Sequence, residues 1–221
     1  MTPSENLPWL WLAADPDLFA DPAQAHVWQI PLDVDAGRLA ALTRTLSPDE
    51  HARAARVPAS LDRDRFVAGR GAVRAILAGY RNAAPEALCF TYSPHGKPEL
   101  TGEPRLHFSV THCEDLALLA VSAGCPVGID LERLRTDFAP EPLAARFFAP
   151  SEQEALAQAL PADKHRVYWS LWTAKEAYLK AVGTGLDTPL NRVAVPPDTD
   201  QMRLLPLAPA PDLVAALIFA D

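Results

Sequence analysis

Cysteine is scarce in this sequence, and its scarcity excludes several classes of protein. The 221 residues include three cysteines, Cys89, Cys113 and Cys125, and no two of them have the C-x-x-C spacing of a zinc or redox motif. An odd set of isolated thiols suits a reducing compartment better than a disulfide-linked fold. We therefore expect a cytoplasmic protein that depends on an ordinary hydrophobic core.

Long apolar runs and an excess of positive charge are also missing. No stretch approaches the roughly 20 apolar residues that span a bilayer. Residues 1–16 contain no lysine or arginine before their short apolar run, so they do not resemble a secretory signal. The formal net charge is -8, and we expect neither nucleic acid nor a membrane as a partner. Anions must instead be bound by local clusters of basic side chains.

Proline is abundant, and 22 prolines divide the chain into short elements. Hydrophobic residues make up 49% of the chain, which is enough for a substantial core. The patterns predict strands at residues 26–34, 106–112, 116–122, 127–132, 192–195 and 213–219, and helices at 46–57, 61–81, 141–148, 150–160 and 164–182. This order predicts an α+β fold of two halves, residues 1–125 and 126–221, and not a regular βαβ alternation.

The stretch VGIDLER at residues 127–133 combines a strand pattern with two carboxylates. Side chains alternate along a strand, so Asp130 and Glu132 share the face opposite Ile129. Two like charges that close repel each other unless they reach water or share a cation. A strand end that emerges into solvent explains them as simply as a binding site does.

The helix predicted at residues 164–182 adds a third carboxylate. Glu176 lies within the apolar arc of its helical wheel, where a glutamate side chain is too short to reach water. An ionised Glu176 therefore needs a cation. Lys180, one turn later, would supply it as a surface pair. Alternatively, Glu176 joins Asp130 and Glu132 around a divalent ion, for which oxygen ligands favour magnesium.

Four ordered motifs resemble those of a known enzyme family. They are GKP at residues 96–98, HFSVTH at 107–112, GIDLE at 128–132 and WTAKEAYLKAVGTGL at 172–186. Together they resemble the motif set of the Sfp-type 4'-phosphopantetheinyl transferases, and a weaker resemblance covers most of the remaining chain. The resemblance implies two similar α+β halves, related by an approximate twofold, with the active site in the cleft between them. It also implies a monomeric, magnesium-dependent enzyme that transfers 4'-phosphopantetheine from coenzyme A to a serine of an apo acyl or peptidyl carrier protein, releasing adenosine 3',5'-bisphosphate.

The resemblance also assigns roles to individual residues. It implies that Asp130, Glu132 and Glu176 bind magnesium and that Lys180 steadies the phosphate oxygens. Either Glu176 or a water on the magnesium would accept the proton of the carrier serine. The implied coenzyme A contacts are Arg53, Arg70, Lys97, Thr111, His112, Lys175 and Lys180. Part of the carrier protein is expected to dock at residues 183–190.

One departure from the family pattern concerns phosphate binding. Glu50 follows the S-P-D start of the helix at residues 46–57, where relatives often carry a lysine. One phosphate contact is then missing or is supplied by another arginine, because Arg65, Arg70 and Arg74 lie on the polar faces of the next helix. The sequence leaves open which arginine holds the 3'-phosphate.

Each phosphate candidate also has a plain structural explanation. Lys97 is otherwise an ordinary turn lysine, and His112 shares a strand face with Phe108 and Val110, as a buried, hydrogen-bonded histidine would. Arginines on a helix surface often do no more than keep it solvated.

Two other functions remain open on the residues alone. One is a different magnesium-dependent phosphotransferase or phosphodiesterase, and the other is a non-catalytic protein that binds coenzyme A or a carrier. The sequence does not distinguish a fatty-acid, polyketide or nonribosomal-peptide carrier. If the three carboxylates converge, their repulsion predicts that Asp130→Asn raises the stability of the metal-free protein.

Overall fold

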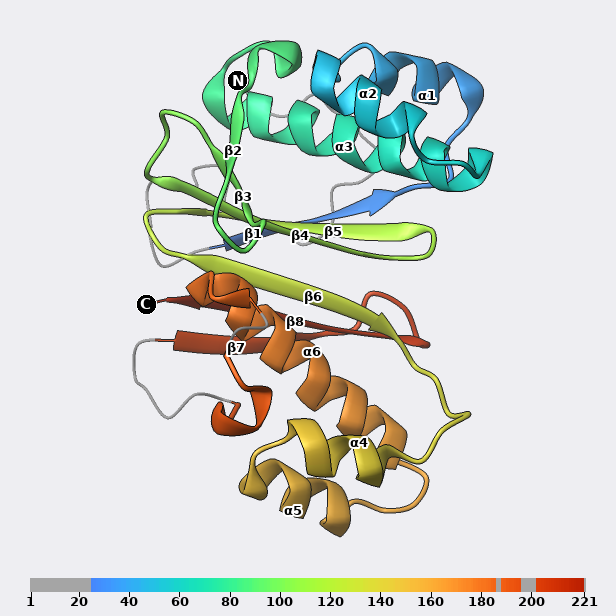
Figure 1. Ribbon diagram of the computed structural model, residues 1–221, viewed down its shortest axis with the longest axis vertical. Coiled ribbons are helices and arrows are strands. Elements are labelled where there is room, and N and C mark those ends of the chain that lie inside the picture. Colours follow the sequence, from blue (N-terminus) through green and yellow to red (C-terminus); the bar gives the residue numbers. More distant parts are fainter. Residues whose placement is uncertain (1–24, 186–187, 196–201, 221) are drawn as a thin grey trace.

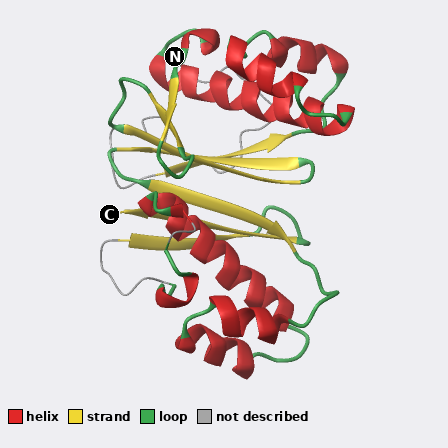
Figure 2. Ribbon diagram, viewed as in Figure 1, coloured by secondary structure: helices red, strands yellow, loops and turns green. Residues whose placement is uncertain are grey.

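The computed structural model describes residues 25–185, 188–195 and 202–220. Two three-stranded sheets pack against each other, and helices cover both outer faces (Figure 1; Figure 2). Residues 1–16, and residues 186–187 of the expected docking loop, lie outside the described part. In that part, no helix is both long and apolar enough to cross a membrane.

The helices are α1 (Ala36–Thr43), α2 (Pro48–Ala55), α3 (Ser60–Arg81), α4 (Pro140–Phe147), α5 (Pro150–Gln158) and α6 (Lys164–Val182). The strands are β1 (Ala25–Pro31), β2 (Phe90–Tyr92), β3 (Pro98–Leu100), β4 (Leu106–Cys113), β5 (Leu116–Ala123), β6 (Val127–Arg133), β7 (Met202–Leu207) and β8 (Leu213–Ala220). Short 3-10 turns, η1 (Pro85–Ala87) and η3 (Leu190–Arg192), follow α3 and α6.

The two sheets repeat one topology. Their strand orders are β1-β5-β4 and β6-β8-β7, with antiparallel pairing throughout, so each sheet places its last strand between its first and second. A β2-β3 hairpin adds to the first half. The long helices α3 and α6 cover the outer faces of the respective sheets (Figure 1). The prediction of two similar α+β halves is confirmed, and residue 125 lies in the turn between β5 and β6.

Alternation along β6 sets the place of its side chains, as the sequence predicted. Ile129 belongs to the core between the two sheets, whereas Gly128 and Asp130 face α6. A side chain at residue 128 would overlap the carbonyl oxygen of Ala177 and the amide nitrogen of Ala181. Glycine is therefore what allows α6 to lie directly on β6.

The predicted strand at residues 192–195 is wrong. Residues 190–192 form η3, and the strand that pairs with β8 is β7. The carbonyl of Val193 accepts from Lys175, and the amide of Val195 donates to Glu152 Oε1 at 2.8 Å. Side chains thus satisfy backbone groups that a strand ladder would otherwise pair. The alternating pattern also failed to indicate α1, β2, β3 and β7.

Candidate active site

Asp130 of β6 lies at the centre of the charged groups beneath α6. Its side chain is buried, and its Oδ1 accepts from Lys180 Nζ at 2.6 Å and from Thr111 Oγ1 at 3.1 Å. Its Oδ2 is also buried, and no described residue donates to it. Lys180 further donates to the carbonyl of Ile129 at 3.1 Å. Lys180 therefore pairs with a strand carboxylate, and the predicted surface pair with Glu176 is not what the structure shows.

The charge of Asp130 affects the pKa values of two neighbouring glutamates. Burial raises the pKa of Glu176, Asp130 raises it further, and Lys180 opposes both effects. Burial is also the main reason why the pKa of Glu132 is raised, with Asp130 and Glu176 adding to it and Lys180 and Arg135 lowering it. The three carboxylates thus form one coupled region of excess negative charge.

The donor type of this region fits magnesium, but the ligand set is not assembled. Among the described residues, no three or more His, Cys, Asp or Glu side chains are grouped to hold a metal ion. The orphaned Oδ2 of Asp130 is a carboxylate oxygen, the donor that magnesium prefers. Lys180 supplies positive charge to the other oxygen. Because Lys180 and Thr111 both donate to Asp130, we now expect the loss of these hydrogen bonds to outweigh the relief of repulsion in Asp130→Asn.

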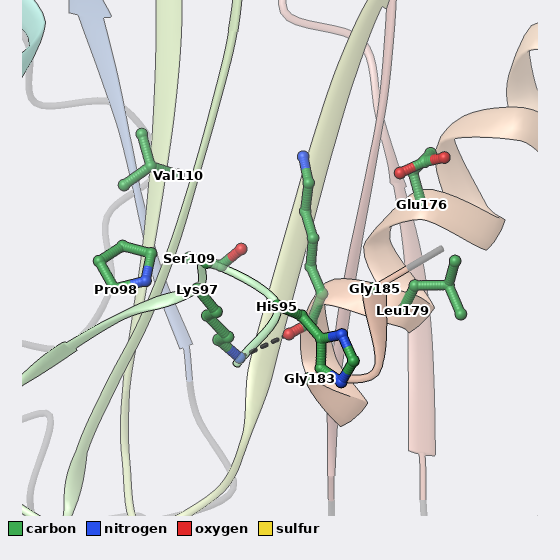
Figure 3. Close-up of a pocket in the computed structure, with 11 residues that line it drawn as sticks. His95, Lys97, Pro98, Ser109, Val110, Glu176, Leu179, Gly183 and Gly185 are labelled. Atoms are coloured by element: carbon green, nitrogen blue, oxygen red, sulfur yellow. Dashed lines mark hydrogen bonds between the residues drawn. The ribbon is translucent and has the colours of Figure 1, made fainter. Parts of the chain in front are cut away.

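A pocket of about 230 Å³ lies between the two halves. The loop before β3 and the strand β4 line one side, and α6 with its following turn lines the other (Figure 3). Lys97 Nζ donates to the carbonyl of Lys180 at 2.5 Å, the dashed line in Figure 3, and to the carbonyl of Val127 at 3.1 Å. Burial lowers the pKa of Lys97, although Glu99 opposes this. Lys97 is thus no ordinary turn lysine, because it ties the first half to the second.

A larger pocket of about 640 Å³ adjoins the first one. The two pockets share Gly96, Pro98 and Val110 in their walls. The basic residues that line the larger pocket are Arg53, Arg65, Arg70 and His112. His112 is exposed at the end of β4, so the alternative of a buried core histidine is wrong. Both pockets therefore have basic side chains in their walls, together with Glu176 in the smaller pocket and Asp62 and Glu114 in the larger one.

Two expected coenzyme A contacts line neither pocket. Lys175 is 0% exposed and donates to Glu152 at 2.7 Å, to the carbonyl of Leu190 at 2.9 Å and to the carbonyl of Val193. It holds the backbone that follows α6, which corrects its expected role. Thr111 is buried and donates to Asp130. Its role is to orient a carboxylate.

Arg74 was expected on a polar face of α3, and this is also corrected. Its side chain is buried and binds Glu50, the residue that departs from the family pattern. Arg65 is engaged at the surface, where its Nε and Nη2 donate to Asp33 at 2.6 and 2.8 Å. Among these arginines of α3, Arg70 combines a place in the pocket wall with a largely buried side chain.

Sequence reasoning missed the aromatic wall of the larger pocket. Tyr92 and Phe66 line it, and Phe90 stacks under Arg70, whose guanidinium carbon lies 4.1 Å from the ring centroid. The alternation of Phe90 and Tyr92 was the available signal, but a three-residue strand is too short for a periodic pattern. Ser109 belongs to the motif at residues 107–112, but the sequence indicated no role for it. Its hydroxyl accepts from the amide of Ile129 at 3.2 Å.

Comparison with known proteins identifies the family. The model of the 4'-phosphopantetheinyl transferase superfamily matches residues 126–211. Over 179 residues the chain is 44% identical to 4'-phosphopantetheinyl transferase HetI of Nostoc sp., covering 80% of this chain and 76% of that protein. It is 26% identical over 150 residues to 4'-phosphopantetheinyl transferase Sfp of Bacillus subtilis, covering 68% and 66% of the two chains. The chain belongs to the 4'-phosphopantetheinyl transferase superfamily.

One solved structure is also similar. The holo-[acyl-carrier-protein] synthase of Thermotoga maritima matches 43% of this chain and 62% of its own length, with 20% sequence identity and a TM-score of 0.36.

Proposed function

We infer that this protein transfers the 4'-phosphopantetheine group of coenzyme A to a serine of an apo carrier protein, releasing adenosine 3',5'-bisphosphate. The observation that carries this inference is the junction of two pockets, a smaller one lined by Lys97, Lys180 and Glu176 and a larger one lined by Arg53, Arg65 and Arg70. Coenzyme A carries a pyrophosphate and, some distance away, a 3'-phosphate. Two adjoining pockets with basic side chains in both walls suit such a molecule.

The larger pocket would hold the nucleotide part of coenzyme A. Arg53, Arg70 and His112 line it, and charge-assisted hydrogen bonds to phosphate are among the strong ones. The pyrophosphate would then reach the smaller pocket, where Lys180 and Lys97 lie in the wall. Both ammonium groups have backbone carbonyls as partners, which fixes their positions before the substrate arrives.

The carboxylates beneath α6 would take part in the chemistry. Asp130, Glu132 and Glu176 would hold magnesium, which neutralises negative charge on a pyrophosphate as it is cleaved. The serine hydroxyl attacks the β-phosphorus, and the phosphoanhydride bond to the leaving bisphosphate breaks. Glu176 is our candidate to accept the serine proton on its carboxylate.

Further features bear on the setting of the reaction. All three cysteines are free thiols, which supports a reducing compartment, and we propose the cytoplasm. Because both halves of the cleft belong to one chain, we propose that the monomer is active. Residues 183–190, which begin at the pocket wall, are our candidate for part of the carrier docking surface.

Mass spectrometry of apo carriers tests this function directly. Purified protein is incubated with coenzyme A, magnesium and candidate acyl or peptidyl carriers, and a carrier should gain the mass of phosphopantetheine. The gain should require magnesium and should fall sharply with the Asp130→Ala variant. If no carrier of fatty-acid, polyketide or nonribosomal-peptide type gains this mass while a control transferase modifies them, the proposed function is wrong.

A further inference from the structure

Glu50 is a buried carboxylate of the first half that binds two arginines. Its Oε2 accepts from Arg74 Nε at 2.5 Å and from the Ser47 amide at 3.0 Å, and its Oε1 accepts from Arg70 Nε. Burial would raise the pKa of Glu50, but the hydrogen bonds from Arg74, Ser47 and Arg70 outweigh it and hold the pKa below its usual value. Glu50 is thus ionised at neutral pH, and a buried charge of this kind requires a partner cation.

Arg74 alone meets that requirement. Its side chain is almost completely buried, and its Nη1 donates to the carbonyls of Pro85 and Leu88 at 2.7 and 2.9 Å. These carbonyls belong to the segment that follows α3. The pair of Glu50 and Arg74 therefore joins α2, α3 and this segment, and the two charges compensate each other.

The second half contains the same arrangement with one cation. Glu152 is the third residue of α5, as its counterpart is of α2, and it accepts from the Ala149 amide at 2.7 Å. Its cation is Lys175 of the following long helix, at 2.7 Å. Lys175 also donates to backbone carbonyls after its own helix, including that of Leu190. A single cation is sufficient for the structural task.

Arg70 is therefore surplus to the structural pair, and its guanidinium is fixed beside the larger pocket. Its side chain is 13% exposed, and Glu50 holds its Nε. One face of the guanidinium lies over Phe90, and Nη2 is 3.4 Å from the hydroxyl of Tyr92. Since Arg74 already balances Glu50, the positive charge of Arg70 is available to a ligand. A guanidinium held in place loses little conformational entropy when it binds phosphate.

We propose that Glu50 is a positioning residue, which aims Arg70 so that this arginine recognises the 3'-phosphate of coenzyme A. The proposal rests on the transfer from coenzyme A inferred above. Arg65 is a weaker candidate because Asp33 already occupies its fork, and Arg53 is an exposed side chain. A glutamate at position 50 thus does not remove a phosphate contact. Where a lysine would contact the phosphate directly, the glutamate orients Arg70 toward it.

The test compares coenzyme A with dephospho-coenzyme A, which lacks the 3'-phosphate. The dissociation constants of both are measured by calorimetry on the full chain. The discrimination ratio is the dissociation constant of dephospho-coenzyme A divided by that of coenzyme A. Arg70→Gln should lower this ratio about tenfold or more, since a charge-assisted bond is lost. Arg81, the last residue of α3, forms a partly exposed pair with Glu103. Arg81→Gln is therefore the matched control and should leave the ratio unchanged.

Glu50→Gln decides whether position, and not charge alone, matters. We expect the ratio to fall at least threefold, and Glu50→Gln should lower it no further when Arg70→Gln is already present. An unchanged ratio would make Glu50 purely structural. An increased ratio would mean that Glu50 only weakens the charge of Arg70. Both results overturn the proposal.

A variant that keeps the buried pair guards against misfolding. Arg70→Lys preserves both the charge and the pair of Glu50 and Arg74, but a lysine cannot bind Glu50 and a phosphate with a planar fork. Its discrimination should fall nearly as far as that of Arg70→Gln, and retention of the wild-type ratio would contradict the role of geometry. If the wild type modifies carriers from coenzyme A while these variants keep its discrimination, the inference fails and the proposed function stands.

Discussion

The first strands of the two halves occupy equivalent places but carry different chemistry. β1 and β6 each have seven residues, and each begins opposite the seventh residue of its half's last strand. In this register, Trp28 corresponds to Asp130, and His26 corresponds to Gly128. Both strands turn these positions toward the long helix of their own half.

The polar side chains under α3 hydrogen-bond to one another, whereas Asp130 Oδ2 under α6 has no donor among the described residues. Tyr80 lies 2.6 Å from His26 Nδ1 and accepts from Trp28 Nε1 at 2.9 Å. Under α6, Lys180 faces a region with more carboxylates than it can neutralise. The contrast teaches that topology alone does not make a site. The proposed binding of a cation beneath α6 depends on this uncompensated charge.

The largest expected effect is on the free energy of unfolding, and it concerns the buried ion pairs that both halves contain. Lys175→Met should lower the free energy of unfolding by about 3–5 kcal/mol, because Glu152 then stays buried without a cation. Arg74→Met should lower it less in the first half, because Arg70 still binds Glu50. Urea denaturation followed by circular dichroism measures both, with exposed Lys164→Met as the control. Wild-type stability of either variant would break the comparison.

The next effect concerns what the halves do not share. Asp130→Ala should slow transfer about a hundredfold, which corresponds to roughly 3 kcal/mol of lost transition-state stabilisation. Tyr80→Phe changes the corresponding cluster of the first half and should alter the rate less than threefold. Initial rates of carrier modification at saturating magnesium provide the measurement. Similar losses in both variants would show that the chemistry is not confined to the second half.

Lys180 should matter through its place beneath α6. We expect Lys180→Ala to weaken the binding of coenzyme A by several-fold, up to about tenfold, since one charge-assisted contact to phosphate is lost. Lys164→Ala, at the other end of the same helix, is the control and should have no effect. Equal, negligible changes in the two dissociation constants would mean that Lys180 only pairs with Asp130.

A smaller effect is expected for the stability of the metal-free protein. Asp130→Asn should lower the melting temperature in EDTA by about 2–4 °C, because the ion pair with Lys180 is lost. Magnesium and coenzyme A should widen the difference, since they stabilise the wild type more. Four melting curves measure this, and a higher melting temperature of the variant in EDTA would restore the idea of stored repulsion.

The smallest effect expected is in the acid dependence of stability. Folding lowers the pKa of Glu50. Its contribution to the free energy of unfolding is therefore complete above its unfolded pKa of about 4.3, and it is lost as the pH falls through the folded pKa. The free energy of unfolding should therefore decline less steeply below about pH 5 in Glu50→Gln than in the wild type. Denaturation series at several pH values compare the slopes. Parallel slopes would indicate that Glu50 does not titrate differently in the folded state.

Local patterns predicted the elements that carry the site. Strand alternation placed Asp130 and Glu132 on the face of β6 opposite Ile129, and the helical wheel singled out Glu176. The S-P-D start of the helix predicted at residues 46–57 is the beginning of α2, where Glu50 accepts from the Ser47 amide. These inferences succeeded because each depends on residues within a few positions of one another.

Long-range partners could not be predicted in this way. Lys175 was expected to contact coenzyme A, and no local pattern could show that Glu152 and the backbone after α6 accept hydrogen bonds from its ammonium group. Likewise, nothing local to Arg74 indicated Glu50, which lies 24 positions away. The strand β7 was missed because its register is set by β8 and not by an alternating pattern of its own.

Gly128 determines how far apart the two sides of the acidic region lie. Its missing side chain brings the backbone of α6 onto β6 at Ala177 and Ala181, each of which directly follows a pocket residue, Glu176 or Lys180. The separation between strand and helix is therefore fixed by the radii of main-chain atoms, which no rotamer change can adjust. Even one methyl group at residue 128 would act as a spacer and change the distance between Asp130 on the strand and Glu176 on the helix.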